Sequence, residues 1–343
     1  MLRQERLSFS KRDIARPIGI FVVTLVVYGM LILAALASPL WASVVLVPVS
    51  GVLVSMLFVI GHDACHQSLT SSGLLNHVIG RIAFLPSLHA FSLWGRQHNQ
   101  RHHRFNNIRY LDCYWVPMSP DEFAKASPAR RWLYQLYRHP IGAGFYYLFE
   151  IWPQQMIIAR RAVLGEVRPV HVADSLLVWA FLAADVAALA TVGSWFDKSA
   201  AISITIGLLL SFVIFTAFLS VATLLHHTHP AVPWYSTLKD WQDDDGTISG
   251  TAHVEMPWYI QNTFLFIMEH TAHHYAPGVP FYNLDGMQRR MNEQGVLSYR
   301  ITLKQFLAVC QACKLFNYEE RHWLNFHGKR TSNVLRTKPI NLA

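Results

Sequence analysis

The chain has 343 residues, of which 52% are hydrophobic and 15% are charged, with a formal net charge of +8 and 18 histidines. Soluble domains carry about 25% charged residues, so this composition excludes intrinsic disorder and argues against an ordinary soluble enzyme. A positive net charge on so apolar a chain is typical of the cytosolic face of a membrane protein. We therefore expect contact with membrane lipid and no nucleic-acid partner.

The apolar stretches predict four membrane-spanning helices. Residues 17–61 contain no Asp, Glu, Lys or Arg, and as one helix they would be much longer than the hydrocarbon core of about 30 Å. They must therefore cross twice, with a break at Ser38-Pro39, because proline removes a helix donor. A second pair of apolar stretches follows later in the chain. The predicted spans are residues 17–37, 40–61, 172–193 and 200–225.

The distribution of basic residues predicts the orientation. Lys and Arg lie mostly in residues 1–16, 62–171 and 226–343, and the short turns within the two pairs of spans contain only Lys198. Four spans place these three segments on the same side, and the positive-inside rule makes that side cytosolic. We expect an all-α integral membrane protein, with residues 1–343 as one domain in a bacterial cytoplasmic membrane. Its four transmembrane helices would form two hairpins beneath a cytosolic helical cap.

Two further features are interpreted as structural. Asp185 falls within the third predicted span, where a carboxylate is costly, so we expect it to face the bundle interior and make a hydrogen bond. Cys310 and Cys313 form a single CxxC that lacks the second pair typical of zinc sites. We interpret these two cysteines as small apolar residues near one face of a C-terminal helix.

Histidines gather in four short segments: GHDACHQS, WGRQHNQRHHRFNN, LLHHTHP and MEHTAHH. His62 and His66 are spaced i, i+4, which places them on one face of a helix. The first and third segments end the second and fourth spans, and the others are cytosolic, so the topology brings all four to one membrane surface. Eight or nine imidazoles are too many for one tetrahedral zinc and suit two metal ions with open positions. Such a site beside hydrocarbon suggests chemistry on a lipid.

These motifs resemble the membrane fatty acid desaturase family and are most similar to its bacterial and cyanobacterial members that act at the Δ12 position. The resemblance implies a non-haem di-iron centre that uses O₂ and two electrons to introduce a cis double bond into a lipid-bound acyl chain. His227, which precedes Thr228 in LLHHTHP, best fits a ligand position before the third histidine box. By motif, the implied metal ligands are His62, His66, His98, His102, His103, His227, His270, His273 and His274.

The sequence departs from the plant-type pattern at two places. The second box reads HxxxHH rather than HxxHH, and Gln67 stands where plant forms carry another histidine. No HPGG-type haem motif is present, which implies a separate electron donor such as a ferredoxin, a flavodoxin or a cytochrome with its reductase. A basic cytosolic surface could dock an acidic carrier, hold anionic lipid headgroups or simply set the topology. Its residues include Arg96, Arg101, Arg104 and Arg109.

Several side chains are candidates to orient the imidazoles through their second ring nitrogen. Three carboxylates, Asp63, Glu255 and Glu269, lie in or near the histidine segments. His229 and His253 are further candidates for this role.

Two other functions remain open. A hydroxylase or ketolase acting on acyl, alkane or carotenoid substrates would use the same ligands. A metal transporter is more remote, because it would place ionisable ligands along a path through the membrane, whereas these histidines lie at the ends of the spans. No residue identifies the position of the double bond or the acyl carrier.

Overall fold

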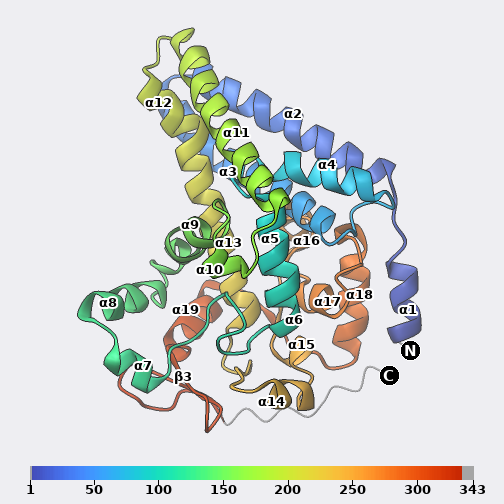
Figure 1. The fold of residues 1–343 in the computed structure, drawn as a ribbon, viewed down its shortest axis with the longest axis vertical. Helices are drawn as coiled ribbons and strands as arrows, with labels where there is room; N and C mark the ends of the chain where they lie inside the picture. The colour runs from blue at the N-terminus through green and yellow to red at the C-terminus, as the bar shows by residue number, and fades with distance from the viewer. Residues whose placement is uncertain (1, 334–343) are drawn as a thin grey trace.

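The computed structural model describes residues 2–333, and for residues 2–5 only the backbone. The fold is mostly helical. Long helices form one end of the elongated molecule, and shorter helices with two small strand pairs form the other (Figure 1).

Four helices of the described chain are long and apolar enough to cross a membrane: α2 (Ala15–Ala37), α3 (Leu40–Cys65), α11 (Pro169–Ser194) and the continuous helix Ala200–His227. The last of these comprises α12 (Ala200–Ile204), the π-helix η4 (Thr205–Leu209) and α13 (Leu210–His227). The shortest, α2, has 23 residues, or about 35 Å, which exceeds the hydrocarbon thickness of about 30 Å. The apolar stretches of the sequence therefore form the four expected spans.

The turn between α2 and α3 lies where the sequence predicts it. Ser38 has an extended backbone, and Pro39 immediately precedes the first residue of α3. The Ser43 hydroxyl donates a hydrogen bond to the Ala35 carbonyl at 2.7 Å, which ties the two helix ends together. Within α3 the helix continues through Pro48, although proline lacks an N–H donor.

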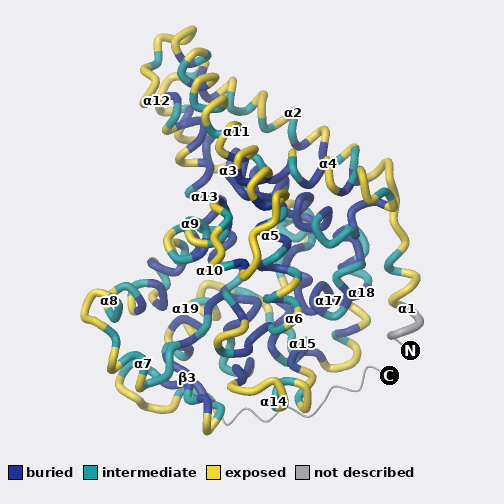
Figure 2. The backbone as a smooth tube through the Cα atoms, in the orientation of Figure 1, coloured by how far each residue is buried: buried dark blue, intermediate teal, exposed yellow. Residues whose placement is uncertain are grey.

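The helices α3 and α13 form the buried centre of the long-helix bundle. The hydroxyls of Ser50 on α3 and Ser211 on α13 hydrogen-bond to each other. A Cβ on Gly51 would lie 2.5 Å from Ile214, so this glycine permits the close approach. By contrast, α2 and α11 are largely exposed (Figure 2) and present apolar side chains such as Val23 and Leu176. Such faces are suited to lipid.

Asp185 on α11 is half-buried and lines a cavity together with Tyr28 of α2 and Gly207 of η4. It therefore faces neighbouring helices. The expected hydrogen bond is not formed, because no donor among residues 2–333 reaches its carboxylate.

Shorter helices surround the ends of α3 and α13. Those before α11 are α1 (Leu2–Phe9), α4 (Gly73–Phe84), α5 (Phe91–Gln97), the π-helix η1 (His98–His102), α6 (His103–Phe105), α7 (Pro120–Lys125), α8 (Pro128–Tyr137), the 3-10 helix η2 (Ala143–Phe145), the π-helix η3 (Tyr147–Ile151), α9 (Trp152–Gln155) and α10 (Arg161–Leu164). Those after α13 are α14 (Leu238–Asp243), α15 (Gly246–Ser249), α16 (Trp258–Thr263), α17 (His270–Tyr275), α18 (Phe281–Glu293) and α19 (Leu303–Ala312).

Two short strand pairs complete the described fold. Strand β1 (His253–Glu255) runs parallel to β2 (Ser298–Arg300), with His253 opposite Ser298. Strand β3 (Leu315–Asn317) runs antiparallel to β4 (His322–Leu324). Each pair brings C-terminal segments together beside the short helices.

Cys310 in α19 and Cys313 just after it are both buried and unbridged. Burial raises the pKa of the Cys310 thiol to about 11, so this thiol stays protonated and is a poor nucleophile or metal ligand. Neither cysteine belongs to a candidate metal-binding group of residues 2–333. Both are packed as small apolar residues, as the sequence indicated.

Replacement of Gly61 by alanine tests the contact between α3 and α4. A Cβ at this position would lie 2.3 Å from the Phe84 ring, so the two helices would have to separate. Overpacking of this kind costs about 1–3 kcal/mol, and we expect a lower thermal denaturation midpoint in detergent. Gly29→Ala on α2 is the matched control, because nothing lies within 4 Å of the added Cβ. Equal midpoints for the two variants would contradict the close packing of α3 on α4.

Candidate metal centre

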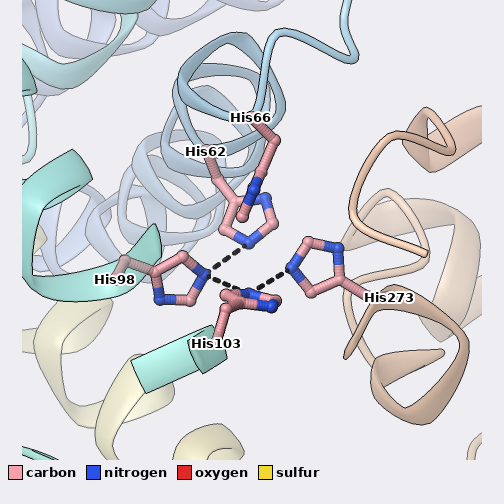
Figure 3. A group of neighbouring side chains, drawn as sticks. All are labelled: His62, His66, His98, His103 and His273. Carbon is pink, nitrogen blue, oxygen red and sulfur yellow. Dashed lines mark hydrogen bonds between the residues drawn. The ribbon is translucent and has the colours of Figure 1, made fainter. Parts of the chain in front are cut away.

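Nine buried or half-buried histidines converge in two adjacent groups. Within each group, every residue offers a ring nitrogen, and these nitrogens all lie within 4.8 Å of one another. These are the nine histidines that the sequence motifs singled out. Group one comprises His62, His66, His98, His103 and His273 (Figure 3), and group two comprises His102, His227, His270 and His274.

Neighbouring residues on one helix enter different groups. His102 belongs to group two and His103 to group one, and His274 and His273 divide in the same way. Consecutive residues of an α-helix point about 100° apart, so two adjacent histidines point to different sides of the helix. The rings of His103 and His274 stack with centroids 4.2 Å apart, which shows how closely the two groups adjoin.

A π-turn shapes the second histidine box. In η1 the backbone N–H of His103 donates to the carbonyl of His98, an i→i+5 bond. Such turns accommodate an extra residue within a helix and often occur at functional sites. The HxxxHH spacing therefore still brings the Nε2 atoms of His98 and His103 to 2.9 Å from each other.

The ring nitrogens of each group point inward. In group one the Nε2 atoms of His98 and His62 are 3.2 Å apart, and those of His273 and His103 are 2.9 Å apart (Figure 3). In group two the Nε2 atoms of His227 and His270 are 2.9 Å apart. Such close nitrogens suit a shared central ion.

Burial keeps several of these imidazoles uncharged. It lowers the pKa of His98, His103 and His274 well below 6.5, and the neighbouring histidines lower it further. Neutral imidazole is the form that binds transition metals. The Nε2 of His66 and both ring nitrogens of His274 are buried without a hydrogen-bond partner in residues 2–333. Because unpaired buried polar atoms are costly, the donor set fits metal ions such as iron or zinc.

Asp63 fixes one ligand of group one. Its Oδ1 lies 3.0 Å from Nδ1 of His62, and its Oδ2 accepts the backbone N–H of Phe281 at 2.6 Å. The carboxylate therefore holds the His62 ring with Nε2 directed inward, as proposed for this residue from the sequence.

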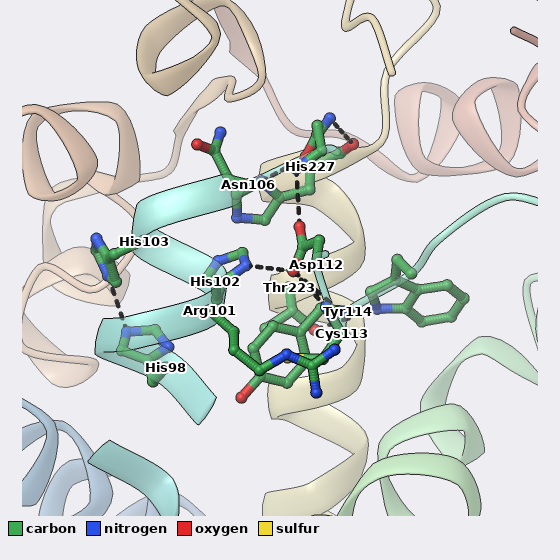
Figure 4. Close-up of polar contacts among 12 residues, drawn as sticks. His98, Arg101, His102, His103, Asn106, Asp112, Cys113, Tyr114, Thr223 and His227 are labelled. Carbon is green, nitrogen blue, oxygen red and sulfur yellow. Dashed lines mark hydrogen bonds and ion pairs between the residues drawn. The ribbon is translucent and has the colours of Figure 1, made fainter. Parts of the chain in front are cut away.

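Asp112 fixes one ligand of group two in the same way, although no sequence pattern indicated this residue. Its Oδ1 lies 2.9 Å from Nδ1 of His102 (Figure 4), and its Oδ2 accepts the backbone N–H of Asn107 at 2.8 Å. Burial alone would raise the pKa of this carboxyl, but His102 and His227 hold it below its usual value. Asp112 lies in an irregular segment, so no spacing signal identifies it.

Asn107 and a backbone carbonyl orient His227. The Nδ1 of His227 lies 3.1 Å from Oδ1 of Asn107 and 3.0 Å from the carbonyl of Gly250. The N–H of Nδ1 donates to these oxygens and leaves Nε2 free to face group two. Asn107 has a positive φ of 60°, a backbone conformation that asparagine tolerates better than most residues.

The other candidate orienting residues divide. Glu269 immediately precedes His270 in the chain, and its Oε2 lies 2.7 Å from Nε2 of His253, so these two candidates pair with each other. By contrast, His229 stacks on Tyr299 with centroids 4.7 Å apart, and burial lowers its pKa to about 4. Glu255 is exposed and bonds to Ser298. Within the described residues, neither His229 nor Glu255 contacts the nine histidines, because β1 and the loop after α13 direct them elsewhere.

His226 is a further residue that the sequence analysis did not select. It is buried, and neither ring nitrogen has a partner among residues 2–333. Its ring stacks on His270 with centroids 3.9 Å apart and interplanar angle 15°. This side chain lines an apolar cavity beside the two groups rather than facing the interior of either group.

A narrow apolar cavity of about 40 Å³ adjoins both groups. His62 and His98 of group one and His102 and His270 of group two border it. Trp94 also lines the cavity and stacks on His98 at 4.0 Å. An almost wholly apolar lining beside the ring nitrogens suits contact with a short stretch of hydrocarbon. Its other lining residues include Phe58, Val59, Tyr114, Tyr147, Phe215, Phe218, Leu219 and Ile267.

Comparisons with known proteins agree with this geometry. The fatty acid desaturase family model matches residues 39–304. A relative named sn-1 oleoyl-lipid 12-desaturase, from Picosynechococcus sp., is 28% identical over 311 residues, covering 88% of this chain and 84% of the relative. A second relative of that name, from Synechocystis sp., is 27% identical and covers 84% of this chain and 78% of its own length.

Plant relatives match over a shorter part of their length. The chloroplastic omega-6 fatty acid desaturase of Arabidopsis thaliana is 26% identical over 250 residues, or 71% of this chain. The aligned region spans about half of that plant protein (52%).

Replacement of Asp112 by asparagine tests its role in group two. The amide removes the negative charge opposite His102, and loss of such a partner typically lowers metal affinity about 10–100-fold. We expect less metal bound per chain after equilibration with a graded series of chelators. Asp121→Asn, an exposed position on α7, is the control. Metal retention equal to that of the control would argue against this role.

Proposed function

Because the chain belongs to the fatty acid desaturase family and is an acyl-lipid desaturase, we propose that it introduces a cis double bond at the Δ12 position of the acyl chain. The observation that carries this proposal is the pair of adjacent histidine groups beside an apolar cavity. The position Δ12 is supported by the names of the cyanobacterial relatives, which are 12-desaturases.

We propose that the two histidine groups each hold one iron ion. Group one offers five imidazoles and group two offers four, and Asp63, Asp112 and Asn107 fix individual rings. Iron bound there supplies the O₂ activation that opens an unactivated C–H bond. Overall, two hydrogens leave the acyl chain, and O₂ with two electrons and two further protons becomes two waters.

The residues around the cavity hold the acyl chain and exclude water. Phe58, Phe215 and Leu219 are buried apolar side chains on α3 and α13. They provide no group that could ionise or donate a proton to a methylene. Reaction at one carbon pair therefore depends on how the chain is placed relative to the imidazoles.

Electrons are proposed to arrive from a separate carrier on the cytosolic side. The histidine groups lie at the ends of α3 and α13, beside the segments that are rich in Lys and Arg. Of the basic residues there, Arg109 is already paired with Glu122 at 2.6 Å, whereas Arg104 lies over the Phe105 ring. An acidic carrier such as a ferredoxin or flavodoxin would complement the unpaired charges.

Replacement of single ligands by alanine should abolish activity and lower bound iron, because each substitution removes one nitrogen ligand from its histidine group. His327→Ala, an exposed position, is the control. Activity and iron content are compared at matched protein level, since metal loss also destabilises metalloproteins. Full activity in any two of the ligand variants would refute the assignment. The variants are His62→Ala, His98→Ala, His103→Ala, His227→Ala, His270→Ala and His274→Ala.

Expression in a bacterium that lacks polyunsaturated lipids tests the reaction. We expect a second double bond at Δ12 of oleoyl chains, located by gas chromatography–mass spectrometry, and no change with His270→Ala. A new hydroxyl or ketone without a double bond would instead indicate an oxygenase on the same scaffold. A double bond at another carbon would refute the Δ12 position and leave desaturation intact.

A further inference from the structure

A buried arginine without a carboxylate partner lies at the end of α8. Arg138 is 3% exposed. Its guanidinium donates to the carbonyls of Trp115 at 2.7 Å and Cys313 at 3.4 Å. It lies over the rings of Trp115, Tyr134 and Trp323, with distances to the centroids of 5.4, 5.4 and 5.9 Å. Within residues 2–333, no carboxylate is within ion-pair distance of it.

Arg138 borders a cavity of about 260 Å³, distinct from the cavity beside the histidines. Two other charged side chains that line it are already neutralised. Glu122 pairs with Arg109 at 2.6 Å, and Arg130 pairs with Glu150 at 2.5 Å. The Arg138 charge is therefore left uncompensated. Buried charges are ordinarily paired, so this cavity is suited to an anion.

The two cavities share a wall. Trp115 lines the Arg138 cavity and stacks on Tyr146 with centroids 4.1 Å apart. On the other side, the indole N–H of Trp115 bonds to the Thr223 hydroxyl at 3.1 Å, and Thr223 lines the apolar cavity. Tyr114 and Tyr147, the chain neighbours of this stacked pair, line the apolar cavity as well. An anion at Arg138 would thus lie next to the acyl slot.

The surface around the Arg138 cavity is suited to a membrane. Trp132 and Ile141, which flank Arg138 in the chain, are 62% and 78% exposed, and Phe149 on η3 is 58% exposed. Trp132 lies on α8, which projects from the body of the molecule (Figure 2), and Ile141 and Phe149 follow α8 in the chain. Exposed aromatic and aliphatic residues beside arginines are typical of elements that lie in the headgroup region.

We propose that Arg138 binds the phosphodiester of a membrane phospholipid whose acyl chain enters the apolar cavity. The inference rests on the proposed desaturase function and adds the class of acyl carrier. Arginine favours phosphate because its planar guanidinium offers several donors at once. Phosphate is shared with soluble carriers such as acyl-CoA and acyl carrier protein, but the membrane-facing surroundings of the cavity favour a lipid.

Binding is measured with the full-length, iron-loaded protein in a neutral maltoside detergent, because the phospholipid of a nanodisc would itself occupy the site. The probes are dihexanoyl phosphatidylglycerol below its micellar concentration and a neutral dihexanoyl galactolipid. We expect the unmodified protein to bind the phosphatidylglycerol at least 10-fold more tightly. Arg138→Met should abolish this preference, and Arg131→Met, which removes a charge from the same helix outside the cavity, should retain it. Equal binding of both probes by the unmodified protein would overturn the inference even if Arg138→Met fails to fold.

Turnover separates the possible carriers, and it separates a failure of the Arg138 site from a failure of desaturation. Oleoyl phosphatidylglycerol should be desaturated with a KM at least 10-fold lower than that of the oleoyl galactolipid, and Arg138→Met should remove this difference. Oleoyl-CoA or oleoyl carrier protein used as efficiently as the phospholipid would overturn the assignment to a lipid. No turnover of any oleoyl substrate, with electron donor present, would count against the proposed function, whereas turnover without headgroup preference would count against Arg138 alone.

Discussion

The removal of nine imidazole rings from water is the constraint on which the rest of the structure depends. A buried imidazole has two polar nitrogens, and leaving either one unpaired is costly. Several rings solve this by turning one nitrogen inward and bonding the other to the protein, as His62 does with Asp63 and His102 with Asp112. These rings require hydrogen-bond partners. The partners determine the positions of α17, of the loop that holds Asn107 and of the start of α18.

The long helices and the short helices have different tasks. The long helices supply length and apolar surface, and α3 and α13 carry histidines at their ends. The short helices supply histidines in adjacent pairs, and the geometry of a helix sends each pair to both groups. The apolar cavity lies where these two parts meet. Imidazoles and apolar side chains therefore line the same cavity.

The sequence predicts the four spans and the nine histidines because both depend on local patterns. A charge-free stretch shows a span, and i, i+4 spacing shows which histidines share a face. The division into two groups is not local, since it depends on how α17 packs against η1 and α6. Asp112 and Asn107 belong to irregular backbone, where no periodicity relates a side chain to its partner. His229 and Glu255 lie close to the right motifs in the chain, but the stacking on Tyr299 and the exposed edge of β1 take them elsewhere.

The bond between Asp63 and the backbone of Phe281 joins residues 218 positions apart. During translation the chain emerges N-terminus first at about 5–20 residues per second, so roughly 10–40 s separate the synthesis of these two partners. Through that interval α3 is already made, while α17 with His273 is still absent. Group one lacks His273, and group two lacks His270 and His274, until nearly the end of that interval. Both groups therefore receive their last histidines only after all four long helices have been synthesised.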